Sequence, residues 1–191
     1  MKSVAIAAVA ATVLLAGQGG VAEADSGSAE RLVGLLAERL ATADTVAAIK
    51  WEAAVRDGGE PVIDDPGREA AIYDAMAQAG AERGLPGSLV RQVFEGQIEA
   101  NKIVQRGLVT EWRYGLVAAQ VPGTDLAGVR PVIDGLNNAI LTELASERGE
   151  FAAPDCPERV AAGVVGVAGS KRLDALHTAA LVRAATPLCG G

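Results

Sequence analysis

Apolar residues recur along this chain at the three- and four-residue spacing of an α-helix. One such stripe precedes Arg56 and contains Leu32, Leu35, Leu36, Leu40, Val46, Ala47 and Ile49. Alanine, the strongest helix former, fills 38 of the 191 positions, and no stretch shows the sustained β-branched alternation of a half-buried strand. The pattern therefore predicts an all-α fold.

Glycine and proline divide this pattern into about six helices, because paired glycines and prolines continue a helix only at a cost. The predicted helices run from the capping residues 25–28 to about Arg56, from Pro66 to about Glu82, from Leu89 to about Trp112, from Asp125 to about Glu147, from the region of Pro154 and Pro157 onward, and from Ser170 to just before Pro187. Residues 115–123 read as a linker. The predicted N-caps are Asp65, Ser88, Asp125 and Ser170.

The amino-terminal segment has the features of an export signal. Lys2 precedes an apolar stretch over residues 4–16, and Ala22-Glu23-Ala24 offers small residues where signal peptidase requires them. We expect a signal peptide over residues 1–24 and a single secreted or periplasmic domain over residues 25–191. An uncleaved membrane anchor is the other interpretation, but the stretch is short for a bilayer span and no later run reaches about 18 apolar residues. The mature form is therefore expected to lack a membrane segment.

The composition is acidic, with a net charge of −7 that the loss of residues 1–24 leaves unchanged. An acidic surface does not attract nucleic acid or anionic membranes, so we expect neither as the main partner. Any cationic site must therefore be local.

Cys156 and Cys189 are the two cysteines of the sequence. Two cysteines in an exported protein usually pair, so we predict a structural disulfide that closes a loop of 33 residues. A reactive thiol or a metal site is the alternative, but the sequence has one histidine, His177, and neither a CxxC nor an HExxH motif. We expect no metal site.

Arg39 and Lys50 are predicted to share one face of the first helix. They are eleven residues apart, and eleven steps of about 100° return to within about 20° of the starting direction. The positions four residues before and after each of them carry leucine, alanine or valine. A cation on such a stripe is costly to bury without a counterion, which a bound anion would supply.

Asn101 and Gln105 stand one turn apart, so their amides project from one face of the third predicted helix. Arg68 lies in the first turn of the second helix and Arg130 lies early in the fourth. Each of these residues alone is typical of a solvated surface or of an ordinary helix pair. As an ordered set with the two stacked cations, they predict a receptor for a small dianion.

These residues occur in a series of short motifs. The series is Ala37-Glu38-Arg39-Leu40, Ile49-Lys50-Trp51, Asp65-Pro66-Gly67-Arg68-Glu69 and Val93-Phe94-Glu95-Gly96-Gln97-Ile98-Glu99-Ala100-Asn101. It resembles the all-helical chorismate mutases over roughly residues 29–189. The export signal, the stretch Asp134-Gly135-Leu136-Asn137-Asn138 and the late cysteine pair resemble the secreted, or gamma, subclass found in bacteria including mycobacteria.

The resemblance implies an isomerase that rearranges chorismate to prephenate. This pericyclic reaction needs no nucleophile, metal or redox group, so no cofactor is expected. Catalysis would come from binding the compact reactive conformer and from stabilising the charge that develops on the ether oxygen. The resemblance also implies a homodimer in which each active site lies within one chain.

By the same resemblance, Arg39 and Arg130 grip the substrate carboxylates through their guanidinium groups. Lys50 contacts a carboxylate and the ether oxygen, and Gln105 donates to that oxygen from the opposite side. The resemblance also implies that Asn101 contacts a substrate carboxylate and that Arg68 contributes positive charge to the pocket. Asp65 and Glu69 are implied to lie near the substrate hydroxyl.

The chain departs from the family pattern at three positions. Some secreted relatives carry a glutamate at the position of Gln105, and a carboxyl group must be protonated before it can donate, whereas an amide needs no added proton. We therefore expect activity that does not require acidic pH. Asn101 occupies a position where relatives usually have serine or threonine. Ile72 occupies a position where a polar residue can approach the ligand, and we expect Glu69 to make that contact in its place.

Two other functions fit the same residues. An exported helical binding protein could hold an aromatic or dicarboxylate metabolite in this pocket without turnover, and a secreted interaction module could keep a vestigial pocket. Substitution of Lys50 and Gln105 distinguishes them from an enzyme, because in an enzyme these side chains act mainly on the transition state.

Overall fold

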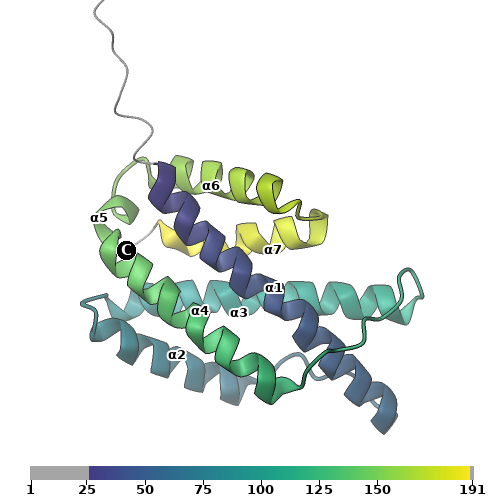
Figure 1. The fold of residues 1–191 in the computed structure, drawn as a ribbon. Coiled ribbons are helices and arrows are strands. Elements are labelled where there is room, and N and C mark those ends of the chain that lie inside the picture. The colour runs from purple at the N-terminus through teal and green to yellow at the C-terminus, as the bar shows by residue number, and fades with distance from the viewer. Residues whose placement is uncertain (1–25, 190–191) are drawn as a thin grey trace, which may run out of the picture.

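The computed structural model describes residues 26–189, which fold into helices joined by loops (Figure 1). The helices are α1 (Ser26–Asp57), α2 (Pro66–Ala81), α3 (Gly87–Arg113), α4 (Leu126–Ser146), α5 (Arg148–Phe151), α6 (Cys156–Lys171) and α7 (Ala175–Ala185), followed by the 3-10 turn η1 (Thr186–Leu188). The predicted all-α fold is confirmed. The predicted signal peptide lies outside the described residues, and within them no helix has the length and apolar character needed to cross a membrane.

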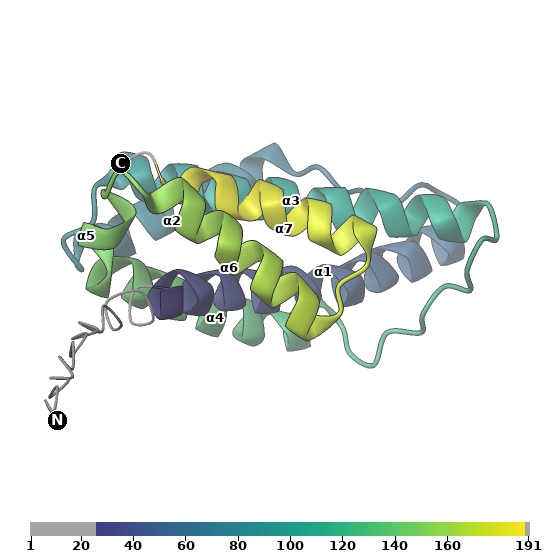
Figure 2. The same cartoon turned by 90° about the horizontal axis from the view of Figure 1, so that it is seen from above.

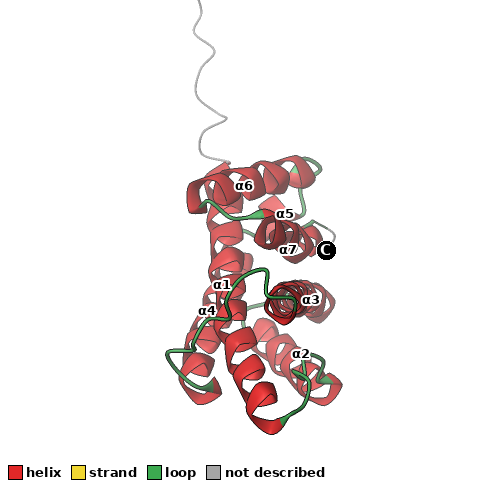
Figure 3. Ribbon diagram, turned by 90° about the vertical axis from the view of Figure 1, so that its right-hand side faces the viewer, coloured by secondary structure: helices red, strands yellow, loops and turns green. Residues whose placement is uncertain are grey.

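The helices form three layers, with α1 and α3 in the middle. α6 packs on α1 and α7 packs on α3, so these two helices cover one side (Figure 2). α4 packs on α1 and α2 packs on α3 on the opposite side, as the end view in Figure 3 shows. Because α2 and α4 contact each other much less than they contact the central helices, space is left between them for a site.

Leucine, isoleucine and phenylalanine side chains fill the core. The largest fully buried apolar side chains include Phe94, Leu32, Leu36, Leu40, Ile140, Leu141, Leu144, Leu181 and Leu188. Where α3 meets the carboxy-terminal segment, a Cβ built at Gly96 would lie 2.9 Å from Pro187 Cγ and 3.2 Å from the backbone oxygen of Ala184. Close helix packing therefore explains a glycine that weakens the helical pattern in the sequence.

The helix ends follow the predicted breaks, with corrections. Asp65 and Asp125 cap α2 and α4 as predicted, since each side chain accepts a hydrogen bond from a backbone N–H three residues later. The predictions for Ser88 and Ser170 are wrong, because both lie inside helical turns, and Asp174 caps α7 instead. The extra helix α5 has four residues, which are too few to show a helical period in sequence.

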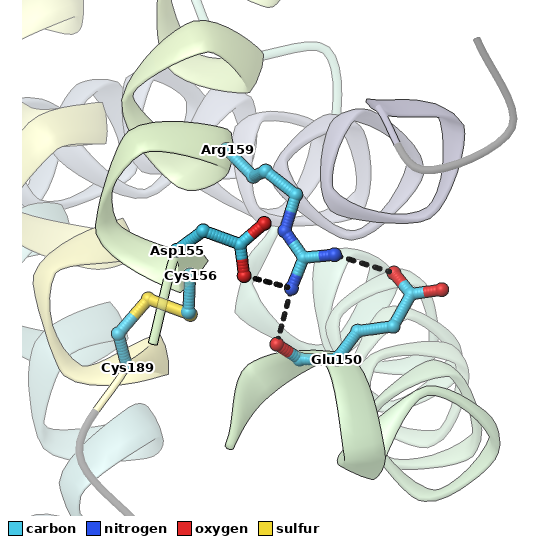
Figure 4. The surroundings of a disulfide bond; sticks show 5 residues. All are labelled: Glu150, Asp155, Cys156, Arg159 and Cys189. Carbon is cyan, nitrogen blue, oxygen red and sulfur yellow. Dashed lines mark hydrogen bonds and ion pairs between the residues drawn. A yellow bond between two sulfur atoms is a disulfide. The ribbon is translucent and has the colours of Figure 1, made fainter. Parts of the chain in front are cut away.

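The predicted disulfide ties the carboxy-terminal helices together. Cys156 at the start of α6 is bonded to Cys189 after η1, with the two Cα atoms 5.7 Å apart, so the predicted pairing is confirmed (Figure 4). Beside the bridge, Arg159 of α6 contacts Glu150 of α5 and Asp155. These bonds fix the corner where α5, α6 and the end of the chain meet.

His177 joins α7 to α1. Its Nε2 lies 2.9 Å from Asp44 Oδ1, and its Nδ1 lies 2.8 Å from Asp174 Oδ1. The hydrogen bond to Asp44 has the largest influence on the pKa of His177 and raises it, and the hydrogen bond to Asp174 adds to this effect. Burial lowers the pKa, but the net result is a rise from 6.5 to about 9. Because the folded-state pKa is the higher one, this contribution to stability is complete below about pH 6.5 and is lost as the pH rises through about 9.

Between pH 6 and pH 9.5, the free energy of unfolding of the wild-type protein should fall by about 1–2 kcal/mol more than that of a His177→Gln variant. This figure allows for solvent screening of the partly exposed ion pairs. Urea denaturation at the two pH values measures the difference. Equal losses in the two proteins would contradict a stabilising role for the charged histidine.

Candidate active site

A cavity of about 540 Å³ lies between the central helices α1 and α3 and the outer helices α2 and α4. Its walls come from α1, α2, α3 and α4 and from the segment 58–65 between α1 and α2. The volume lies in the range of small-molecule sites. The cavity is lined by all eight residues predicted to bind substrate: Arg39, Lys50, Asp65, Arg68, Glu69, Asn101, Gln105 and Arg130.

Arg39 is the most deeply buried cation of the cavity, with 4% of its surface exposed. Its Nε donates to Asn137 Oδ1 of α4 at 2.6 Å, and its guanidinium carbon lies 6.0 Å from the centre of the Phe94 ring. Burial lowers the pKa of Arg39 to about 10, and the nearby Asp134 carboxylate only partly opposes this. The group stays charged at neutral pH, and a charge at this depth requires an anionic partner for compensation.

Lys50 lines the same cavity three turns further along α1, as the eleven-residue spacing predicts. Its Nζ donates to the backbone oxygen of Ile63 in the 58–65 segment at 3.4 Å. Burial lowers the pKa of Lys50, and the Asp65 carboxylate acts in the opposite direction. Because the ammonium is partly desolvated, it attracts an incoming anion more strongly than a fully hydrated lysine would.

Gln105 and Asn101 line the cavity from α3. Gln105 is 6% exposed, and its side-chain oxygen has no hydrogen-bond partner among the described residues. Asn101 Nδ2 donates to the backbone oxygen of Gln97 at 3.0 Å, which uses one of the two N–H groups of this amide. Buried amide atoms cost stability unless they are hydrogen-bonded, so this wall of the cavity favours a polar ligand.

Arg68 and Arg130 are exposed and form the rim of the cavity. Arg68 belongs to the first turn of α2, and Arg130 belongs to the second turn of α4. Five lysine and arginine residues line the cavity. In the described part of the chain, one of them, Lys102, forms ion pairs with carboxylates, and the other four form none. Against these five cations stand four carboxylates of the lining, so the cavity carries a small local excess of positive charge on an acidic protein.

Asp65 and Glu69 form a reciprocal cap at the start of α2. Asp65 Oδ1 accepts from Arg68 N at 3.0 Å, and Glu69 Oε1 accepts from Asp65 N at 3.1 Å. Glu69 Oε2 accepts from Lys102 Nζ at 2.8 Å. The two carboxylates predicted to approach a substrate hydroxyl are therefore held in place by backbone and lysine contacts.

Two buried polar residues, Lys102 and Asn137, belong to the site although neither is among the predicted residues. Asn137 fixes Arg39 from α4, and Lys102 fixes Glu69 from α3. An amide on the otherwise apolar stripe of α4 is the signal that could have identified Asn137. Lys102 follows the predicted Asn101 directly and resembles an ordinary surface lysine in sequence, so no comparable signal marks it.

The cavity is equipped for anion binding and charge stabilisation. Within the described residues, its lining contains no serine, cysteine or histidine that could act as a nucleophile. Besides the carboxylates of Asp57, Glu60, Asp65 and Glu69, it contains cations and neutral amides, which can bind carboxylates and stabilise negative charge that develops during a reaction.

The sequence of this chain is similar to those of known chorismate mutases. A family model described as chorismate mutase type II matches residues 29–106, which cover most of α1, all of α2 and most of α3. The secreted chorismate mutase of Mycobacterium tuberculosis is 30% identical over 158 residues, which are 83% of this chain and 76% of that protein. The secreted chorismate mutase of Mycolicibacterium smegmatis is 31% identical over 192 residues, which cover 99% of each chain.

Solved structures extend this similarity to the fold. The chorismate mutase from Burkholderia phymatum has a TM-score of 0.81 and 36% sequence identity, covering 88% of this chain and 99% of that chain. The chorismate mutase from Burkholderia thailandensis has a TM-score of 0.77 and 30% identity, covering 85% and 99%. With relatives this similar over nearly its whole length, the chain belongs to the type II chorismate mutase family.

Proposed function

We propose that this chorismate mutase rearranges chorismate to prephenate in the cavity that Arg39 and Lys50 line, within a single chain. The observation that carries the proposal is the group of four cations that line this cavity without forming ion pairs to carboxylates of the described chain. Chorismate has two carboxylates. They supply the counterions that buried Arg39 and half-buried Lys50 require.

Arg39 and Arg130 bind the two substrate carboxylates and hold the substrate in its compact conformer. Asn137 already fixes the guanidinium of Arg39, so little side-chain freedom is lost when the substrate binds. Arg130 approaches from the rim and adds the second contact. Because the reaction is unimolecular, holding its two reacting carbon ends close together removes much of the entropic part of the barrier.

Lys50 and Gln105 act on the ether oxygen. As its bond to the ring carbon breaks and the new carbon–carbon bond forms, negative charge develops on this oxygen, and no proton is transferred. An ammonium and an amide N–H on opposite sides stabilise this charge more in the transition state than in the bound substrate. The partial desolvation of Lys50 strengthens its share.

The loss of chorismate absorbance after addition of purified residues 25–191 tests this function. We expect rapid loss, with prephenate as the product. A folded, disulfide-bonded protein that binds chorismate but does not convert it would overturn the enzymatic proposal and favour a binding protein.

The pH dependence of this reaction should be weak. We expect similar wild-type rates at pH 5 and pH 7.5, because the Gln105 amide donates a hydrogen bond without being protonated. In a Gln105→Glu variant the donor exists only while the new carboxyl is protonated, so its rate should fall by about tenfold per pH unit above the pKa of that group. A steep fall of the wild-type rate between pH 5 and pH 8 would contradict the role of Gln105.

We infer that the protein is secreted, to the periplasm or to the medium. The two mycobacterial relatives are named as secreted, and the disulfide fits an oxidising compartment. Amino-terminal sequencing of the exported protein should begin at Asp25. Recovery from the cytoplasm with residues 1–24 retained would refute this inference.

We also propose a homodimer, which the resemblance to the family implies. We infer that each chain keeps its own site, because all eight predicted substrate contacts line one cavity of one chain. Light scattering should give the mass of two chains. Mixing wild type with an inactive variant should leave the activity per wild-type chain unchanged. A monomeric mass, or loss of activity on mixing, would contradict the corresponding part of the proposal.

A further inference from the structure

Lys102 differs from the other cations of the cavity because it is surrounded by carboxylates. Its Nζ lies 2.7 Å from Glu99 Oε1, 2.8 Å from Glu69 Oε2 and 3.4 Å from Asp64 Oδ1. Its side chain is 9% exposed. Burial lowers the pKa of Lys102, but the hydrogen bonds to Glu69 and Glu99 raise it above its usual value overall, so this ammonium is charged at neutral pH.

Lys102 joins three parts of the cavity wall. Glu99 belongs to α3, Glu69 belongs to α2, and Asp64 belongs to the 58–65 segment, from which several residues line the cavity. Arg106, one turn after Lys102, also binds Asp64, at 2.6 Å. The contact of Lys102 with Glu69 is more buried than the contacts with Asp64, since the Glu69 side chain is 17% exposed and the Asp64 side chain is 56% exposed.

The position of Glu69 depends on this lysine. One carboxylate oxygen accepts from the backbone N–H of Asp65, and the other accepts from Lys102. Lys50 also experiences the negative charge of Glu69. Without Lys102, the Glu69 carboxylate could turn toward the unpaired cations of the cavity, among them Lys50, whose pKa burial lowers and the charge of Glu69 already raises in part. A carboxylate that moved there would compete with the carboxylates of the substrate.

We propose that Lys102 is a positioning residue for the rearrangement: it holds Glu69 in the wall of the cavity, directed toward the substrate, and keeps its carboxylate away from Lys50. This inference rests on the proposed function of the cavity. It assigns to Lys102 no contact with the substrate, because the lysine acts through Glu69.

The kinetic constants of Lys102→Gln, Lys102→Arg, Glu69→Gln and the double variant Lys102→Gln/Glu69→Gln test this role. We expect Lys102→Gln to lower kcat/KM by about 10- to 100-fold, with an increase in KM, because a misplaced group near the reacting atoms typically costs this much. Lys102→Arg keeps the charge and should retain at least about a third of the wild-type value. In the Glu69→Gln background, Lys102→Gln should change kcat/KM by less than about threefold, because no carboxylate remains to be misplaced.

Arg91→Gln is the matched control. Arg91 is also on α3 and pairs with an acid on α2, Asp74, at 2.6 Å, but neither residue lines the cavity. Its loss should leave kcat/KM within about twofold of wild type, as expected for an exposed ion pair. Rates are compared per folded protein, measured by circular dichroism, and the double variant covers the case in which Lys102→Gln alone does not fold.

The outcomes separate this inference from the function on which it rests. A wild-type protein without turnover would refute the proposed function itself. An active wild type with an unchanged Lys102→Gln variant would overturn the role of Lys102. An equal loss in the presence and absence of the Glu69 carboxylate would overturn it as well, since the lysine would then act by another route.

Discussion

Replacing Lys50 by alanine should lower kcat for the rearrangement of chorismate by about 10³-fold, while KM changes by less than about tenfold. The structure supports a large effect because the ammonium is partly desolvated and lines the cavity without an ion pair to a carboxylate of the described chain. A group that mainly stabilises charge in the transition state contributes more to kcat than to substrate affinity. Steady-state kinetics of the variant measures both constants.

Lys171→Ala is the control for this substitution. Lys171 is exposed at the end of α6 and contacts Glu38 at 3.5 Å, outside the cavity. Its kinetic constants should match those of wild type, as expected for a surface ion pair. If Lys50→Ala kept kcat within about tenfold of wild type, or changed only the affinity for chorismate, the role of Lys50 in the chemical step would be excluded.

Removing the disulfide should have the largest effect on stability. The bridge closes a chain segment of 33 residues. The loop-entropy estimate for such a bridge is about 3–4 kcal/mol, and stabilities of whole domains are about 5–15 kcal/mol. The double variant Cys156→Ser/Cys189→Ser should therefore unfold at a clearly lower urea concentration than the oxidised wild type.

The same variant should keep its activity when it is assayed as folded protein. No residue of α5, α6, α7 or η1 in the described part of the chain lines the cavity, so the bridge lies outside the catalytic machinery. Wild type under reducing conditions should match the double variant in stability. A free energy of unfolding within about 1 kcal/mol of oxidised wild type would show that the bridge stabilises the fold much less than the loop-entropy estimate indicates.

The parts of the fold that are evident in the sequence are those with strong local signals. Asp65 followed by Pro66 marks the start of α2, because the side chain caps free N–H groups and proline suits the first helical position. Ser88 and Ser170 have the same local chemistry as true caps, and only the continuation of helical backbone through them excludes that role. Local composition therefore predicts that a helix ends nearby more reliably than the residue at which it ends.

The site shows the same division. The spacing of Arg39 and Lys50 places them on one face of α1, since helix geometry alone determines that relation. The contact between Arg39 and Asn137 joins residues 98 positions apart and depends on how α4 packs against α1. The pairing of Lys102 with Glu69 likewise requires α2 to lie against α3. Relations within a helix follow from sequence, whereas relations between helices require the packing.

The most direct test of the central claim is a crystal structure of the protein with a stable bicyclic dicarboxylate that mimics the compact transition state. We expect one carboxylate within about 2.7–3.2 Å of the Arg39 guanidinium, with the ether oxygen placed between Lys50 Nζ and the Gln105 amide. All of these contacts should come from one chain. An analogue bound elsewhere, or bound in this cavity with its ether oxygen away from both Lys50 and Gln105, would contradict the proposed mechanism.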